Sequence, residues 1–265
     1  MTDEKINNIR AAVFKYRPLI HCITNPISIT QCANAVLAVG ARPIMAEHPK
    51  EVKGITKNAK ALLINLGNIT DVRMKSMKIS MIEARKSDIP IVIDAVGVAC
   101  SELRRRFAKK LIKKYVPSVV KGNYSEIKAL YDEKYTSSGV DTEQNCRTEE
   151  IIKISAELAK KYKTVILASG KEDIIADGSR VLIIKNGTHK LSEVTGTGCM
   201  LGALCACFLA VSPAVEALVC ACAILGYCGE RTQAYGMSFL VELIDKLSDR
   251  EKIYLKLEER KFEEF

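Results

Sequence analysis

The 265-residue chain contains no tryptophan, only three histidines and 6% aromatic residues. Motifs of several large protein classes are also missing. The chain has no GxxxxGK[ST] sequence, which argues against a P-loop NTPase, and no strand–GxGxxG–helix at its start, which argues against a nicotinamide-binding Rossmann domain. It has no HExxH pair and no CxxC spacing, so the sequence gives no sign of a bound transition metal.

The composition is that of an ordinary globular protein. Hydrophobic residues make up 48% of the chain, charged residues 27%, and the mean hydropathy is +0.05. These values exclude collagen-like, coiled-coil and mostly disordered chains. We expect one domain over residues 1–265, although the last 17 or so residues give no structural signal.

The ten cysteines lie in apolar runs, and the first ten residues lack the apolar segment of a signal peptide. The sequence therefore predicts small hydrophobic thiols in the reducing cytoplasm rather than a disulfide framework.

The net charge of +9 raises the possibility of a nucleic-acid partner. Basic residues concentrate on helix-like stretches such as 103–115 and 156–163. No helix-turn-helix, zinc finger or aromatic-basic RNA motif accompanies them. We therefore expect these basic residues to form solvated helix faces. Attraction of a nucleoside triphosphate is the next interpretation, and we expect no nucleic-acid partner.

Short apolar strands alternate with segments of helical periodicity. Strands are predicted at 17–24, 43–46, 61–67, 89–95, 117–123 and 164–170, followed by a hairpin over 172–187 with its turn at Asp177-Gly178. Helices are predicted at 28–40, 49–59 with Pro49 in the first turn, 70–87 capped by Thr70 or Asp71, 101–115, 124–131 and 148–163; residues 133–147 form a polar excursion. This order predicts an α/β fold with a doubly wound, mostly parallel sheet and helices on both faces.

Ligands of such sheets bind beyond the carboxyl ends of the strands. The residues that follow the predicted strands are therefore candidates for a site. They are Asn25, Asn65, Leu66, Gly67, Asp94, Lys121, Gly122, Asn123, Ser169 and Gly170.

Residues 200–228 are apolar, with Glu216 as their one charged residue. Each half around Ser212-Pro213 is shorter than the ~20 residues that span a bilayer. We expect two buried core helices and no membrane insertion. Small residues would let them pack closely: Gly202, Ala203, Ala206, Ala221, Ala223 and Gly226.

The segment EVTGTGCMLGAL (193–204) has two glycines around a threonine, before a long apolar helix that should begin at Gly198 or Cys199. Free N–H groups and the helix dipole at such a start form an anion hole suited to a phosphate. The same position predicts a lowered pKa and more thiolate character for Cys199. A plain glycine-rich turn with a buried cysteine is the alternative.

The segment NYSE (123–126) follows a strand and begins a helix. Asn123 and Glu126 lie on one helical face and could orient Mg²⁺ beside a triphosphate. The spacing also fits a capping box, and the residues alone favour that reading.

Six segments in order resemble hydroxyethylthiazole kinases, which belong to the ribokinase-like superfamily. They are HCITNPISITQCANAVLAVGARPIMA (21–46), LLINLG (62–67), VIDAVGVAC (92–100), VKGNYSEI (120–127), ILASGKEDIIADG (166–178) and VTGTGC (194–199). The resemblance runs from about residue 10 to 248. It implies ATP-dependent phosphorylation of the alcohol of 4-methyl-5-(2-hydroxyethyl)thiazole in thiamine salvage, by a homotrimer whose sites lie between two subunits.

The resemblance also implies roles for individual residues. Asn25, Met45, Gly67 and Gly196 would bind the thiazole, with Gly196 and Gly198 forming the anion hole. Lys121, Asn123, Ser169 and Gly198 would face the ATP phosphates, and Asp94 and Glu126 would organise Mg²⁺. Cys199 stands where most ribokinase-like enzymes carry a catalytic aspartate base.

Three residues depart from the family pattern. Ala95 replaces a proline, Lys121 an arginine, and Lys171 the third residue of a Thr-Gly-Glu-type motif. Lysine keeps the charge at 121 but loses the bidentate fork of arginine, which bears on ATP affinity and nucleotide preference.

Two other functions stay open from the residues. One is a related kinase of another vitamin-like alcohol, of the hydroxymethylpyrimidine or pyridoxal type. The other is a cysteine hydrolase or acyltransferase with Cys199 as nucleophile and His189 as base.

Overall fold

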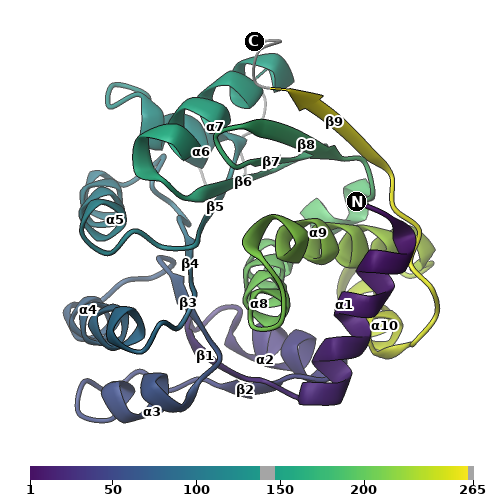
Figure 1. The fold of residues 1–265 in the computed structure, drawn as a ribbon, viewed down its shortest axis with the longest axis horizontal. Helices are drawn as coiled ribbons and strands as arrows, with labels where there is room; N and C mark the ends of the chain where they lie inside the picture. The colour runs from purple at the N-terminus through teal and green to yellow at the C-terminus, as the bar shows by residue number, and fades with distance from the viewer. Residues whose placement is uncertain (138–146, 262–265) are drawn as a thin grey trace.

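The computed structural model describes residues 1–137 and 147–261, and a single sheet runs through that part of the chain (Figure 1). Its strands are β1 (Leu19–Ile23), β2 (Arg42–Ile44), β3 (Ala61–Asn65), β4 (Ile91–Asp94), β5 (Val119–Asn123), β6 (Val165–Ser169), β7 (Asp173–Ala176), β8 (Arg180–Ile184) and β9 (Leu257–Lys261). The strand order is β2-β1-β3-β4-β5-β6-β7-β8-β9. Strands β1 to β6 are parallel, while β7, β8 and β9 are antiparallel to their neighbours. The mostly parallel sheet is confirmed.

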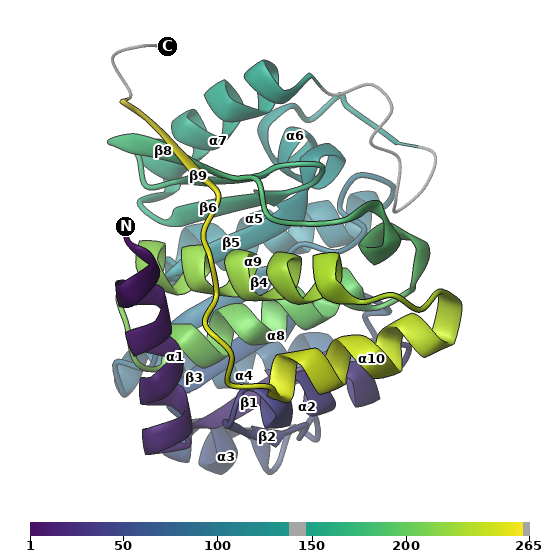
Figure 2. The same cartoon turned by 90° about the vertical axis from the view of Figure 1, so that its right-hand side faces the viewer.

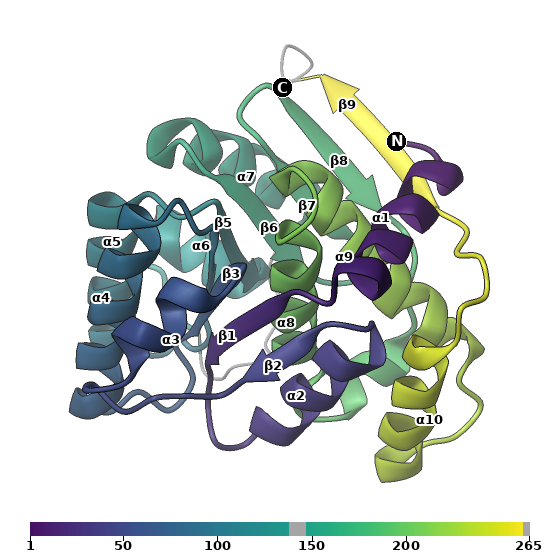
Figure 3. The ribbon, with the colours of Figure 1, turned by 60° about the horizontal axis from the view of Figure 1, so that its bottom comes forward.

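Helices cover both faces of this sheet (Figures 1 and 3). One layer contains α3 (Val52–Asn58), α4 (Asp71–Lys86), α5 (Glu102–Tyr115), α6 (Tyr124–Tyr131) and α7 (Thr148–Tyr162). The other contains α1 (Asp3–Tyr16), α2 (Ile29–Ala38), α8 (Thr197–Leu209), α9 (Ala214–Arg231) and α10 (Gly236–Ser248). Each layer has its own buried apolar cluster against the sheet. The doubly wound arrangement is thus confirmed.

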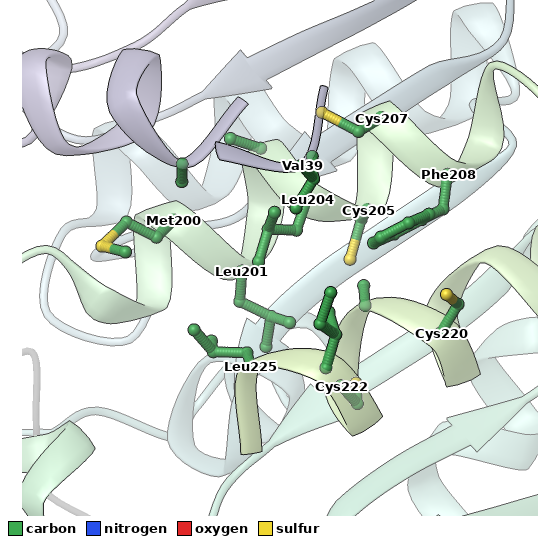
Figure 4. Close-up of a cluster of buried hydrophobic side chains, with 14 of the residues drawn as sticks. Val39, Met200, Leu201, Leu204, Cys205, Cys207, Phe208, Cys220, Cys222 and Leu225 are labelled. Carbon is green, nitrogen blue, oxygen red and sulfur yellow. The ribbon is translucent and has the colours of Figure 1, made fainter. Parts of the chain in front are cut away.

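The pair α8 and α9 forms the centre of the second layer (Figure 4). Among the side chains that interdigitate there are Leu201, Leu204, Phe208 and Leu225, with cysteines filling the smaller spaces. The two buried core helices are confirmed. Within the described residues, no helix has both the length and the apolar character that crossing a bilayer requires.

The parallel strands are buried because both of their faces are covered. All five residues of β3 are buried. The hairpin of β7 and β8 closes through Gly178 and Ser179, between Asp177 and Arg180. Gly178 takes φ +89°, the positive value that the first central residue of a type II′ turn needs.

The sequence placed some boundaries wrongly. Helix α3 begins at Val52, because Pro49 and Lys50 form a turn in which Glu51 donates to the carbonyl of His48. Helix α8 begins at Thr197, one or two residues earlier than expected. Helices α1 and α10 and strand β9 were not predicted at all. Of the polar excursion over 133–147, residues 138–146 lie outside the described part of the chain.

Candidate functional site

Three polar side chains stand side by side across the carboxyl ends of β3, β4 and β5. The strand register pairs Asn65 with Asp94, and Asp94 with Lys121. They lie beneath α8, because a Cβ atom on Gly202 would come within 3.0 Å of Asp94 Oδ2. The neighbouring strand β1 leads into Asn25 at the point where the winding of the sheet reverses. Ligands of doubly wound sheets bind at this switch point.

Lys121 and Asp94 form a buried ion pair. Lys121 Nζ lies 3.1 Å from Asp94 Oδ1, and the exposed fractions of the two side chains are 4% and 0%. The ammonium also donates to the carbonyl of Gly198, at 2.9 Å. Burial is the largest single effect on the pKa of Lys121 and lowers it, but Asp94, Glu126 and Cys199 together outweigh burial, so the pKa is raised and the lysine stays charged. Burial raises the pKa of Asp94, against the opposing effects of Lys121 and Asn65.

Helix α8 begins directly above this pair. Gly196 is its N-cap at φ +99°, a left-handed conformation that favours glycine. The first intrahelical bond runs from the N–H of Met200 to the carbonyl of Gly196. The N–H groups of Thr197, Gly198 and Cys199 therefore precede the helical ladder, as an anion-binding helix start requires.

The prediction of a lowered pKa for Cys199 is wrong. Burial raises the pKa of this thiol, and the carboxylate of Asp94 raises it further. Lys121 and the hydrogen bonds of Ser28 and Asn25 act in the opposite direction and do not prevail. The sequence showed the helix start but not the buried acid beneath it, so Cys199 rests as a thiol.

Two asparagine amides connect Cys199 to the strand ends. Asn25 Nδ2 donates to Asn65 Oδ1 at 3.1 Å and to Cys199 Sγ at 3.3 Å. Asn65 Nδ2 donates to Asp94 Oδ2 at 3.0 Å and to Cys199 Sγ at 3.2 Å. Gly67 must be glycine here, since a Cβ atom would come within 2.8 Å of Asn25 Nδ2. Asn65 was a candidate only as one of the residues after a strand, and nothing in the sequence singled it out.

Asn123 and Glu126 form the capping box of α6. The N–H of Glu126 donates to Asn123 Oδ1, and the N–H of Asn123 donates to Glu126 Oε2 at 2.7 Å. The other carboxylate oxygen, Oε1, accepts the N–H of Gly97, also at 2.7 Å. Burial raises the pKa of Glu126 to about 7, against the effects of Lys121 and these backbone donors. The cap is therefore present, and it ties α6 to the loop after Asp94.

The remaining predicted residues lie around this centre. Met45 follows β2, half-buried, and packs against the same apolar cluster as Cys199. Ser169 ends β6 opposite Asn123, with its hydroxyl donating to the carbonyl of Gly122 at 3.4 Å. His189 is exposed, and its imidazole bonds the surface carboxylate of Glu193 rather than the thiol of Cys199. A cysteine–histidine pair thus gains no support.

Comparisons with known proteins identify the family of this chain. Residues 11–252 match the model of the Hydroxyethylthiazole kinase family. The chain belongs to the hydroxyethylthiazole kinase family. It is 48% identical over 248 residues to hydroxyethylthiazole kinase 2 of Clostridium botulinum (strain 657 / Type Ba4), covering 90% of this chain and 93% of that protein. The hydroxyethylthiazole kinase of Finegoldia magna is 41% identical over 209 residues, which are 79% of this chain and 77% of that one.

Solved structures lead to the same family. The structure of a hydroxyethylthiazole kinase protein from Pyrococcus horikoshii OT3 is 32% identical, has a TM-score of 0.89 and covers 97% of this chain and 100% of that one. The pyridoxal kinase of Staphylococcus aureus is 14% identical with a TM-score of 0.66 and covers 92% of this chain and 98% of that one. At that identity the second likeness concerns the fold alone, which is ribokinase-like.

Proposed function

We propose that this chain transfers the γ-phosphoryl group of ATP to the hydroxyl of 4-methyl-5-(2-hydroxyethyl)thiazole, a salvage step toward thiamine. The observation that carries the proposal is the charged Lys121, buried with Asp94 directly under the start of α8 and beside Cys199. The family membership supports the substrate.

Phosphoryl transfer depends mainly on positioning and on neutralising charge. The oxygen of the alcohol forms a bond to the γ-phosphorus, the bond from phosphorus to the bridging oxygen breaks, and ADP leaves. The start of α8 and the ammonium of Lys121 provide donors for the oxygens of the moving group. Among the described residues, the ammonium of Lys121 donates to Asp94 and to the carbonyl of Gly198, which leaves one of its three N–H groups for a phosphate.

Cys199 is the proposed acceptor of the hydroxyl proton. Only the thiolate form can take that proton, and burial with Asp94 keeps this form scarce near neutral pH. A strong base is not essential in a loose transition state, where the proton leaves late. General-base assistance contributes about 10²–10⁴-fold to such rates.

Mg²⁺ fits this site if the phosphates of the nucleotide and water supply most of its ligands. Within residues 1–137 and 147–261, no group of three or more histidine, cysteine or acidic side chains could form a metal cage. Mg²⁺ is commonly held by one or two carboxylates, substrate phosphates and water. Asp94 and Glu126 could provide those carboxylates. When bound, the ion would neutralise charge on the phosphates.

On the substrate side, we propose that Asn25, Met45, Gly67 and Gly196 surround the thiazole. Gly67 supports this because it brings the backbone close to Asn25. Asn123, Ser169 and Gly198 are proposed to face the ATP phosphates, since they lie at strand ends or at the start of α8.

We also propose that the enzyme is a homotrimer with sites between two subunits. Helices α2 and α10 lie side by side (Figure 2). Both expose large apolar side chains, among them Leu37 of α2. Tyr235, Met237 and Val241 are 71%, 70% and 63% exposed. An apolar surface of this kind is typical of a subunit interface. Analytical ultracentrifugation should give three times the chain mass for the wild type and the monomer mass for Met237→Lys with Val241→Lys; a monomeric wild type would contradict the proposal.

Two further proposals concern the extent of the kinase domain and the location of the protein in the cell. The chain is proposed to act as one kinase domain over residues 1–265, since its described strands share one sheet. It is proposed to work in the cytoplasm, because the described cysteines are free thiols and most are buried.

Product analysis tests the proposed function. Purified protein with Mg²⁺ and ATP should convert the thiazole alcohol into a product heavier by one phosphate, with one ADP per product. Hydroxymethylpyrimidine and pyridoxal serve as comparison substrates for the alternative of a related vitamin kinase. Phosphorylation of one of these and not of the thiazole would overturn the substrate assignment while keeping the fold and the ATP site.

A further inference from the structure

Two side-chain amides converge on one sulfur atom. Asn25 Nδ2 lies 3.3 Å and Asn65 Nδ2 lies 3.2 Å from Cys199 Sγ. The two asparagines come from different elements, the loop after β1 and the end of β3. Both are buried, at 4% and 0% exposure. A sulfur that meets two amide nitrogens accepts hydrogen bonds from both, because an amide nitrogen is only a donor.

Backbone donors fix which way each amide points. Asn25 Oδ1 accepts the N–H groups of Ile27 and Ser28, both at 3.1 Å. Asn65 Oδ1 accepts the N–H of Gly67 at 2.9 Å. Turning either amide over would place its NH₂ group against these N–H donors. The nitrogen of each amide must therefore face the sulfur.

The side-chain amide of Asn65 uses both of its N–H groups and accepts two hydrogen bonds at its oxygen in this arrangement. Its oxygen accepts from Gly67 and Asn25, and its two N–H hydrogens go to Asp94 and to Cys199. One planar group thus fixes the acid, the thiol and the second amide relative to one another. Since buried polar groups are costly when unpaired, the sulfur is part of what stabilises this network.

We propose that Asn65 is a positioning residue for the phosphoryl transfer, holding the Cys199 sulfur as a hydrogen-bond acceptor beside Asp94, with Asn25 as the second donor. This inference rests on the proposed function for its role in turnover. The N–H donors stabilise negative charge on the sulfur more than they stabilise the neutral thiol. They also fix where the substrate hydroxyl can meet it.

The sharpest variant is Asn65→Asp. Aspartate keeps an oxygen for Gly67 and Asn25 but replaces the N–H donor with an oxygen that faces both Asp94 and Cys199. We expect kcat to fall about 10- to 100-fold, as for loss of a charge-assisted hydrogen bond, with little change in KM for the thiazole. Asn65→Ala is a second variant that removes the donor without adding charge.

Asn186→Asp is the matched control. Asn186 is also buried, and its Nδ2 donates to the carbonyl of Tyr254 while its Oδ1 accepts the N–H of Lys256. It contacts the C-terminal segment and no residue of the site. This variant should lower the melting temperature and leave kcat unchanged.

A double-mutant cycle separates positioning from a merely structural role. In the Cys199→Ala background, both Asn65 substitutions should lower kcat much less than they do in the wild type. Equal fold losses in both backgrounds would overturn the proposal, because Asn65 would then act independently of the sulfur.

One of these cycles, made of the wild type, Asn65→Ala, Cys199→Ala and their double variant, tests the contact itself without substrate. If Asn65 donates to the sulfur, the drop in melting temperature of the double variant is smaller than the sum of the single drops. Additive drops would overturn the proposed contact. If the wild type phosphorylates no thiazole, the proposed function fails, while this substrate-free cycle still decides whether Asn65 holds Cys199.

Discussion

At the scale of single residues, the chemistry of Cys199 depends on its neighbours more than on its position at a helix start. A helix N-terminus normally favours a thiolate. Here the sulfur is covered and lies near Asp94, and both effects raise its pKa. The favourable contributions come from Lys121 and the polar side chains around the sulfur. In the absence of substrate, these favourable contributions therefore offset only part of the cost of forming the thiolate.

Replacing this thiol should affect turnover more than binding. We expect Cys199→Ala to lower kcat about 10²- to 10⁴-fold and to change KM for the thiazole little, because the thiol acts on the hydroxyl proton. Steady-state kinetics measures both. An unchanged kcat would contradict the role of Cys199 as base.

The pH profile provides a second check on the same residue. The pKa is raised, so the thiolate fraction grows as pH increases through neutrality, and kcat of the wild type should rise over that range. Cys199→Ala should lack this rise. Identical profiles for the two proteins would assign the ionisation to another group.

The buried ion pair predicts a loss of stability. Lys121→Met leaves Asp94 charged and unpaired beneath α8, which costs about 3–5 kcal/mol in the free energy of unfolding. Lys121→Met combined with Asp94→Asn should cost less than the sum of the two single changes. Denaturant unfolding measures all three, and additive losses would show that the pair does not interact.

Sequence reasoning identified residues that lie together near the strand ends, but it did not identify the hydrogen bonds between their side chains. Asp94 could be predicted because it ends a strand, Lys121 because it lies near the carboxyl end of one, and Cys199 because it lies in the first turn of a helix. The role of Asn65 could not, since it depends on the register of β3 with β4 and on the turn at Gly67. The thiol pKa was predicted with the wrong sign because burial is a property of the folded chain.

At the scale of elements, α9 approaches the segment after β8 so closely that position 226 requires glycine. A Cβ atom on Gly226 would lie 2.4 Å from the carbonyl oxygen of Asn186. The sequence predicted small residues for packing between helices. At this position the close neighbour is instead the backbone after β8.

A pair of glycine substitutions tests this packing. Gly226→Ala should destabilise the protein by at least about 1–3 kcal/mol, because backbone atoms must move. Gly54→Ala in α3 is the control. Its Cβ atom meets nothing within 4 Å, so it should be neutral or stabilising by about 0.4–1 kcal/mol. Equal effects on the denaturation midpoint would contradict the packing account.

Most elements with strong periodicity or β-branched runs were predicted. Helix α10 was missed although it buries Phe239, Leu240, Leu243 and Leu247 at helical spacing, while two other elements were missed for clear reasons. Helix α1 buries Ile6, Ile9 and Val13, but it also buries the charged Arg10 and exposes the aromatic Tyr16, which hides the pattern. Strand β9 is a leucine followed by four charged residues, and it becomes a strand only because the edge of β8 is available for pairing. Such tertiary pairing cannot be read from local sequence.

At the scale of the whole molecule, the segment after α10 joins distant parts of the chain (Figure 2). Asn7 of α1 donates to and accepts from the backbone of Ile253, at 3.1 and 3.0 Å. Asn186 holds Tyr254 and Lys256 in a similar way. We call residues 253–261 the C-terminal strap. The family match ends at residue 252, so the strap lies beyond it.

Ending the chain after Lys252 should therefore weaken the fold without changing the chemistry. The truncation removes the buried Ile253 and strand β9, and we expect the melting temperature to fall by at least about 5 °C. The kcat should stay within about twofold, since residues 253–261 make hydrogen bonds to α1, β8 and Asn186 and, within that described part, none to the site. An unchanged melting temperature would show that the strap does not stabilise the fold.

The central claim is that this site phosphorylates a thiazole alcohol. The most direct test is the ratio of kcat/KM for the thiazole alcohol to kcat/KM for hydroxymethylpyrimidine and pyridoxal, measured as ADP release with Mg²⁺ and ATP. We predict a ratio of at least about 100, the scale on which a substrate's own contacts discriminate. A ratio near or below one, or no ADP release with the thiazole, would contradict the account.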